Sequence, residues 1–96
     1  LRLFNVFNFP NPFASETQFS FEISSTAEIS VDIYTLGGRK IRQIRPQSVN
    51  TGYNFINWDG RDKYGDILAN GVYLYRIKAI NGNESVSTIG KIAKYQ

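Results

Sequence analysis

Apolar and polar residues alternate along most of this chain with a period of two. In Thr17–Ser24, for example, the apolar residues Phe19, Phe21 and Ile23 are separated by single polar ones. This alternation is typical of a β-strand with one buried face, because successive side chains of a strand point to opposite sides. The period of 3.6 residues that marks an amphipathic helix is missing. The pattern therefore predicts an all-β fold.

Seven segments are predicted as strands from the alternation and from the turn residues between them: Leu3–Phe9, Thr17–Ser24, Glu28–Tyr34, Arg39–Arg45, Tyr53–Trp58, Val72–Ile80 and Ser85–Ala93. We expect Pro46 to end the fourth strand, because proline cannot donate to a ladder, and Gln47–Gly52 to form a loop. Asn81-Gly82 predicts a type I′ hairpin turn, and Gly90 predicts a bulge. Seven short antiparallel strands with turns between them are typical of a β-sandwich.

The aromatic residues of the second half allow two interpretations. Trp58, Tyr73 and Tyr75 could stack on a carbohydrate if they lay exposed on one surface. The alternation instead places Trp58 on the same face as Ile56, and places both tyrosines on the same face as Ile77. A tryptophan packed between two sheets is common in sandwiches. We therefore expect these aromatic residues in the core.

Composition limits the class of protein. The chain has 96 residues, of which 42% are hydrophobic and 15% aromatic, enough for the core of one domain spanning residues 1–96. It has no long apolar run that would insert into a membrane. Leu1 stands where a natural start would have methionine, so we expect a fragment of a larger protein.

The charged residues point away from nucleic acid and from catalysis. Eleven basic and eight acidic residues give a net charge of +3, and the one basic cluster, from Arg39 to Arg45, is interrupted by Ile41 and Ile44. We interpret this cluster as a solvated strand face rather than a nucleic-acid surface. The chain has no histidine or cysteine, and most of its carboxylates occupy outward strand positions. We therefore expect no enzymatic activity and no catalytic residues.

Three aspartates in one glycine-rich loop are the sharpest local feature. Asp59, Asp62 and Asp66 could converge on a hard cation such as Ca²⁺, which binds six to eight oxygen ligands. Alternatively, their side chains accept hydrogen bonds from backbone N–H groups and hold tight turns. Arg61 and Lys63 lie in the same loop and oppose a cation. We therefore predict turn scaffolding and no cofactor, with calcium as the alternative.

Four segments together resemble a known family. Asn8–Phe13 contains the sequence PNPF, and Ile33–Arg39 matches the pattern IYxxxGR. Trp58–Asp66 matches WDGRDxxG, and Gly71–Arg76 matches GVYxYR. In this order and spacing they resemble the C-terminal domains of the type IX secretion system, type A, and also the Ig-like domain of flagellar hook-capping proteins. The residues of this structural motif are Pro10, Asn11, Pro12, Gly38, Trp58, Asp59, Gly60, Asp62, Gly65, Gly71 and Tyr73.

The resemblance implies a seven-stranded Ig-like antiparallel sandwich at the C-terminus of an exported protein, at the cell surface, in the outer membrane or outside the cell. Such a domain would be a non-catalytic sorting module whose partners are the translocon, outer-membrane shuttle or sortase proteins, and upstream domains of the same chain. The segments Asp62–Asp66 and Leu68–Tyr73 look closer to the tail of the gingipain-like sortase itself. A cargo tag and a retained sortase tail therefore both remain open.

The last strand is the expected contact with a partner. A terminal edge strand offers unpaired backbone groups, and Lys91, Ile92 and Lys94 place two cations around an apolar residue. Two other hypotheses remain: an accessory module of an extracellular enzyme, for stability or carbohydrate binding, and an assembly domain as in hook capping.

Overall fold

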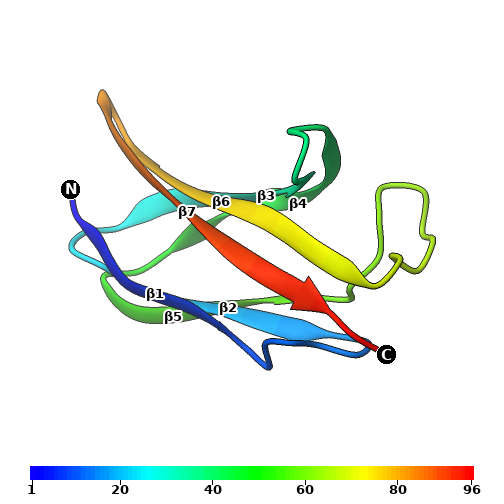
Figure 1. Cartoon of the computed structure of the whole chain (residues 1–96). Helices are drawn as coiled ribbons and strands as arrows, with labels where there is room; N and C mark the ends of the chain where they lie inside the picture. Colours follow the sequence, from blue (N-terminus) through cyan, green and yellow to red (C-terminus); the bar gives the residue numbers. More distant parts are fainter.

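Seven β-strands build two sheets that pack face to face (Figure 1). The structure is a computed structural model and describes all residues from Leu1 to Gln96. The strands are β1 (Leu3–Phe9), β2 (Thr17–Ile23), β3 (Ala27–Thr35), β4 (Lys40–Val49), β5 (Gly52–Trp58), β6 (Gly71–Asn81) and β7 (Glu84–Lys94). The structure contains no helix of the length and apolar character needed to cross a membrane. The all-β prediction is confirmed.

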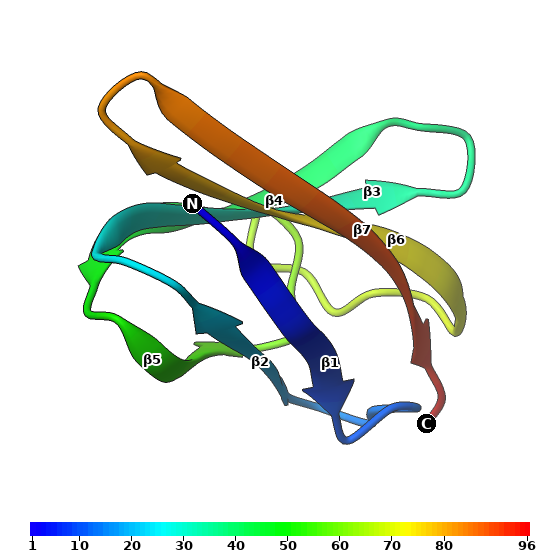
Figure 2. The same ribbon diagram turned by 90° about the vertical axis from the view of Figure 1, so that its left-hand side faces the viewer.

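The chain passes between the two sheets three times. One sheet has the strand order β1-β2-β5 and the other has the order β4-β3-β6-β7, and all neighbouring strands are antiparallel. Figure 2 shows the three-stranded sheet below the four-stranded one, with β5 at its outer end. The predicted seven-stranded antiparallel sandwich is therefore confirmed.

The core lies between the sheets and is made of the alternating apolar positions. Trp58 is buried at its centre and stacks on Phe19, with ring centroids 6.2 Å apart, while Phe19 also packs against Tyr75 at 4.9 Å. Tyr73 and Ile77 point into the same layer. The expectation that the tryptophan and these tyrosines belong to the core is confirmed, because the alternation of each strand matches the face that the sandwich buries.

Strand β4 extends beyond its predicted end. It continues through Pro46 to Val49, so the prediction of a loop over Gln47–Gly52 was wrong for its first three residues, and also for Gly52, which begins β5. Pro46 is tolerated because β4 is an edge strand and because the register with β3 shifts at this point, between Ile29 and Val31. A bulge on an edge strand is a position at which proline breaks no required hydrogen bond.

Two details of the last hairpin also differ from expectation. Its two turn residues are Gly82 and Asn83, and only Gly82 has positive φ (59°), so the turn has the type II′ pattern rather than I′. The pairing of β6 with β7 shows no register shift, so Gly90 forms no bulge. Gly90 lies opposite Tyr75, and a Cβ atom there would overlap the Tyr75 ring. The glycine makes room for that ring.

Replacing Trp58 by alanine should cost about 3–5 kcal/mol of unfolding free energy, because the change empties the centre of the core. Phe55→Ala is the matched control. It removes an aromatic ring from the exposed face of the same strand and should cost less than about 1 kcal/mol. Urea denaturation followed by circular dichroism measures both. Similar losses in the two variants would contradict the assignment of Trp58 to the core.

Candidate functional site

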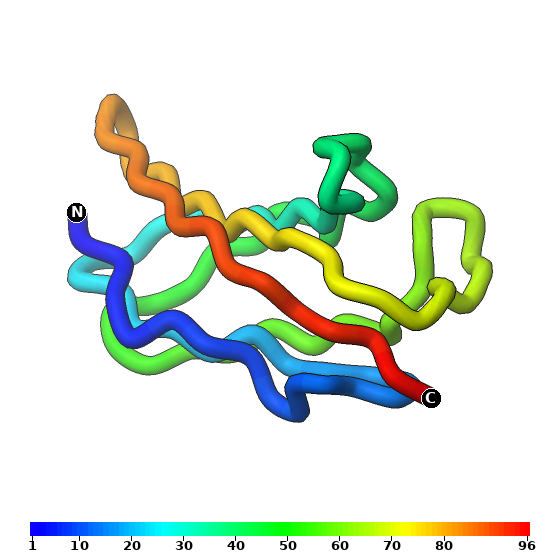
Figure 3. The backbone as a smooth tube through the Cα atoms, in the orientation of Figure 1, coloured from blue at the N-terminus to red at the C-terminus, as the bar shows by residue number.

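Three of the segments that the sequence analysis singled out meet at one end of the sandwich. The segment after β1, the loop after β5 and the end of β7 lie together there, although they are far apart in sequence. Figure 3 shows the C-terminal end of the chain beside the turn that leads from β1 to β2. An isolated bridge between Phe13 and Lys94 joins the two segments. We call this end of the molecule the motif end.

Phe13 closes the core at the motif end. Its side chain is fully buried, with its ring centroid 5.2 Å from that of Trp58. Its backbone binds β7 on both sides, because the Phe13 N–H donates to the Ala93 carbonyl (2.9 Å) and the Tyr95 N–H donates to the Phe13 carbonyl (3.0 Å). Phe13 thus adds one residue of parallel strand to the sheet edge while its ring fills the gap between the sheets.

Asn11 continues this contact along β7 with its side chain. Its amide nitrogen donates to the Lys91 carbonyl (3.3 Å), and its amide oxygen accepts from the Ala93 N–H (3.0 Å). The Pro10 carbonyl, on the other side of the turn, accepts a hydrogen bond from the Thr17 hydroxyl (2.8 Å). The Pro-Asn-Pro segment is therefore a cover for the last residues of the β7 edge, which satisfies backbone groups that an open edge would leave unpaired.

The three residues expected to contact a partner lie in different environments. Ile92 is 1% exposed and belongs to the core, and Lys94 is 3% exposed. The Lys94 ammonium donates to the Ala14 carbonyl and to Gln96 Oε1, and it lies 5.8 Å from the centre of the Phe13 ring. Only Lys91 is exposed. The partner-binding role remains a prediction, but two of its three side chains are structural, because the cover formed by residues 11–14 encloses them.

Asp59 and Asp62 hold the loop after β5 through their side chains. Asp59 Oδ1 accepts from the Arg61 N–H (3.0 Å), and Asp62 Oδ1 accepts from the N–H groups of Tyr64 (2.9 Å) and Asp66 (3.0 Å). These are the hydrogen bonds that the turn-scaffold interpretation predicts. Asp66 participates through its backbone, and the three aspartates do not gather into a group that could hold a metal ion.

Arg42 of β4 ties this loop to the four-stranded sheet. Its guanidinium donates to Asp59 Oδ1 (2.9 Å) and to the Arg61 carbonyl (2.8 Å), and the same carbonyl accepts from the indole N–H of Trp58 (3.1 Å). Arg42 thus makes a surface contact that the interpretation of the basic cluster as a solvated face did not include. Sequence reasoning missed this contact because the two partners are 17 residues apart, one in β4 and the other in the loop after β5.

The charge of Asp59 is stabilised by these contacts. Burial raises the pKa of this carboxyl, but the hydrogen bonds from the Arg61 N–H and from the Arg42 guanidinium outweigh burial, and the pKa lies below its ordinary value. Asp59 is therefore ionised over a wider pH range in the folded protein than in the unfolded chain.

Gly60 allows the loop to reach the Pro-Asn-Pro-Phe segment. Its φ is 74°, and a Cβ atom would overlap the Ser15 carbonyl and lie 2.9 Å from Phe13 Cε2. The other motif glycines, Gly38, Gly65 and Gly71, also have positive φ but face open space. Tyr73 completes the motif: its ring is buried and its hydroxyl donates to the Ala69 carbonyl (2.6 Å).

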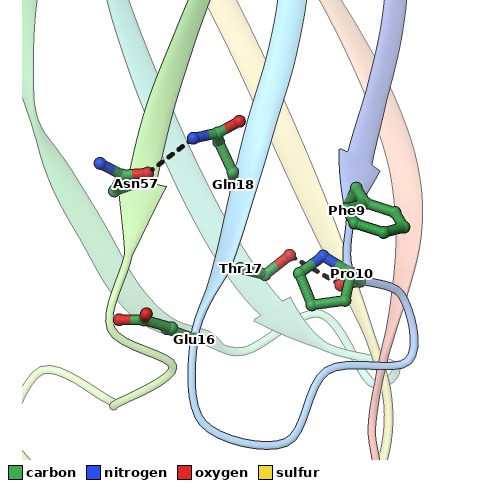
Figure 4. A pocket seen from close by; sticks show the side chains of 6 residues that line it. All are labelled: Phe9, Pro10, Glu16, Thr17, Gln18 and Asn57. Atoms are coloured by element: carbon green, nitrogen blue, oxygen red, sulfur yellow. Dashed lines mark hydrogen bonds between the residues drawn. The ribbon is translucent and has the colours of Figure 1, made fainter.

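A shallow hollow of about 390 Å³ lies beside the same turn (Figure 4). Its wall combines the exposed Phe9 ring with the side-chain amides of Gln18 and Asn57, which are joined by a hydrogen bond of 3.0 Å. Glu16 is the one titratable side chain in the lining, so the hollow offers a ring and hydrogen-bonding groups rather than an acid–base pair. Among the predicted site residues, only Pro10 lines it.

Comparisons with known proteins agree with this geometry. The family model described as "FlgD Ig-like domain" matches residues 8–83. The crystal structure of dimeric latent PorU from Porphyromonas gingivalis is similar with a TM-score of 0.79 and 27% identity, over 93% of this chain and 9% of that chain. The structure of PorZ, an essential surface component of the type-IX secretion system of the same organism, is similar in fold. Its TM-score is 0.61 at 20% identity, over 96% of this chain and 12% of that chain. No curated protein matches the chain.

Gly60→Ala should destabilise the protein more than Gly65→Ala. Both substitutions force alanine to a positive φ, which costs about 1–2 kcal/mol. At Gly60 the new methyl group also overlaps the Ser15 carbonyl, and the forced shift should add about 1–3 kcal/mol. Chemical denaturation of the two variants measures the difference. Equal losses would show that the loop does not need its close contact with the Phe13 segment.

Asp59→Asn should remove a pH-dependent part of the stability. Because the folded pKa of Asp59 is lowered, its ionised form stabilises the protein above the unfolded pKa of about 3.9, and this contribution disappears as the pH falls through the folded value. The wild type should be more stable than the variant at pH 7, and the difference should shrink below about pH 4. Melting temperatures measured from pH 7 down to acid test this; a constant difference would exclude the charge as its cause.

Proposed function

Because the chain belongs to the family of FlgD Ig-like domains, we propose that it is a non-catalytic recognition module of a type IX secretion protein, carried as a sorting domain on cargo or as the retained tail of the sortase. The observation that carries this proposal is the similarity to PorU, which extends over 93% of the chain with 27% identity. The likeness in fold to PorZ, itself a surface component of that system, agrees with it. The chain spans only 9% of the PorU chain and 12% of the PorZ chain, so the proposal concerns this domain and not the activity of a whole protein.

The partner would contact the outer face of β6 and β7. Lys91 is exposed there and pairs in register with Leu74, and Ile89 beside it is 68% exposed. A cavity of about 240 Å³ on this face is lined by Tyr34, Gly38, Leu74, Arg76 and Ile89. Arg76 is paired with the buried carboxylate of Asp32 (3.5 Å), so Lys91 supplies the free positive charge beside this apolar floor. The combination fits a partly apolar segment of a translocon, shuttle or sortase protein that carries an acidic side chain. We assign the partner contact to this surface because the side chains of Ile92 and Lys94, which the sequence suggested for it, are buried.

The proposal places the domain outside the cytoplasm, at the cell surface or in the medium, and requires no cofactor. In this proposal the loop from Asp59 to Asp66 holds the turns after β5 and binds no partner. The upstream part of the parent chain is the remaining partner of the domain, because the module must present its outer face while attached to that part.

An accessory module that binds carbohydrate is the second candidate, and the hollow beside Phe9 favours it. An exposed aromatic ring next to the amides of Gln18 and Asn57 is a combination that can stack on a sugar and hydrogen-bond its hydroxyls. Binding of oligosaccharides that disappears in Phe9→Ala, with export unchanged, would support this second candidate.

Export of a fusion protein tests the main proposal. The domain joined to a periplasmic reporter should carry the reporter out of a host with a type IX translocon. The double variant Ile89→Asp, Lys91→Glu should leave the fusion in the periplasm, because it inverts the charge of the proposed contact face. The double variant Arg45→Glu, Gln47→Asp is the control, since it changes the net charge equally at exposed positions of β4.

Secretion is measured by reporter activity in the medium and on washed cells. An intact fusion that stays in the periplasm would overturn the proposal, and equal export of both double variants would overturn the assignment of the contact face. Deleting Lys91–Gln96 is not a clean test. That deletion removes the buried residues Ile92 and Lys94, so we expect it to unfold the sandwich as well.

A further inference from the structure

The outer edge of β5 is open. β5 pairs with β2 on one side only, and none of the backbone hydrogen bonds outside the sheets reaches Gly52–Trp58. Figure 2 shows β5 at the end of its sheet, with no strand beyond it. The Gly52 carbonyl accepts from the Asn54 side-chain amide (3.3 Å). The other N–H and C=O groups that point away from β2 are a row of unpaired donors and acceptors, which is the template to which another strand can add.

The other three sheet edges each carry a feature that prevents such pairing. β7 is covered by Asn11 and Phe13 over its last residues. β1 is broken by a register shift between Phe4 and Phe7, with Asn5 at a φ of 50°, and it runs beside β7. Cationic side chains, a bulge and proline are the devices by which proteins protect edges.

The edge of β4 is protected by sequence. It carries Lys40, Arg42 and Arg45, and Pro46 interrupts its row of donors. β5, in contrast, has the sequence GYNFINW, with no charged residue and no proline, and its register with β2 is unbroken over all seven residues. Among the four edges, β5 alone combines an unbroken register with a sequence that has no charge and no proline.

We propose that β5 pairs antiparallel with β5 of a second copy of this chain, which joins the two three-stranded sheets into one of six strands. The distribution of charge favours a second copy of the chain as the strand that pairs with β5. A chain with net charge +3 repels its own copy wherever charged edges meet, but neutral β5 can face itself without placing like charges opposite. A two-fold axis through such a pair gives an isologous interface, the commonest arrangement of homodimers.

The side chains of β5 fit this axis. Phe55 is the central residue of the seven, so a symmetric antiparallel alignment places Phe55 opposite Phe55 of the second copy and Tyr53 opposite Asn57. These three residues share the outer face of the sheet, where Phe55 is 56% exposed. An aromatic cross-strand pair stabilises an antiparallel sheet. The interface is one strand long, so the association is weak and depends on concentration.

Self-association is tested with two matched variants. Ser20 of β2 lies between Phe7 of β1 and Phe55 of β5, so Phe7→Lys and Phe55→Lys place the same charge in the same row of the same face, at opposite edges of the sheet. Phe7 is 48% exposed, close to Phe55. Sedimentation velocity of the 96-residue chain up to about 1 mM should show a monomer–dimer equilibrium for the wild type and for Phe7→Lys. In Phe55→Lys the dissociation constant should rise by about tenfold or more, because two lysines then face each other.

A charge-exchange experiment identifies the two-fold axis. Phe55→Lys and Phe55→Glu should each be monomeric alone, and an equimolar mixture should associate again, because opposite charges then face each other across the axis. A wild type that stays monomeric over the whole range would overturn the proposal. So would equal losses in Phe7→Lys and Phe55→Lys, which would mean association through the aromatic face rather than the edge. The outcome is independent of export, since the proposed translocon contact lies on the other sheet.

Discussion

The packing of Phe13 against Trp58 is the contact on which the motif end of the molecule depends. The two rings lie 5.2 Å apart at the place where the two sheets would otherwise separate. Phe13 can reach this place only because its own backbone is bound to β7, and Trp58 is held from the other side by its hydrogen bond to the Arg61 carbonyl. One aromatic contact therefore couples the turn after β1, the loop after β5 and the last strand.

This coupling explains why the motifs occur together. Asn11 completes the pairing of β7, Gly60 leaves space for the Phe13 segment, and Asp59 fixes the turn that presents the Arg61 carbonyl. Asn11, Gly60 and Asp59 are thus each required by the geometry of their neighbours. A sequence that keeps the motifs thus reports a closed sandwich, and recognition by a partner has to use the surfaces that this closure leaves exposed.

The sequence predicted the strands well because the alternation of a half-buried strand is a local property. The burial of Phe19, Trp58 and Tyr75 follows from that period alone. The failures come from interactions between segments distant in sequence. Lys94 occupies a position that looks like a free cation near the terminus. It is buried because the Ala14 carbonyl, 80 residues earlier, accepts from its ammonium group.

The candidate site was predictable in part for the same reason. The side chains of Asp59 and Asp62 bond to backbone groups two to four residues away, and such turns can be inferred from spacing. Arg42 and the hollow beside Phe9 depend on which strands become neighbours, and the alternation does not contain that information. Topology had to be known before these residues could be assigned.

The contacts that close the motif end also determine which edges of the two sheets are covered. A sandwich that joins β1, β7 and the Pro-Asn-Pro segment on one side protects two edges there by contact, so those strands need little protection in their own sequences. On the opposite side the loop after β5 contacts β4 at one backbone position, where the Lys63 N–H donates to the Ile41 carbonyl (2.7 Å). There β4 relies on cations and Pro46, while β5 keeps a neutral sequence. Because an unprotected edge tends to pair, the absence of charges from β5 is compatible with a soluble domain only if its pairing is weak or serves an assembly. Pairing through β5 is weak because the interface is one strand long. The aromatic residue at the centre of β5 provides the contact through which an assembly could form.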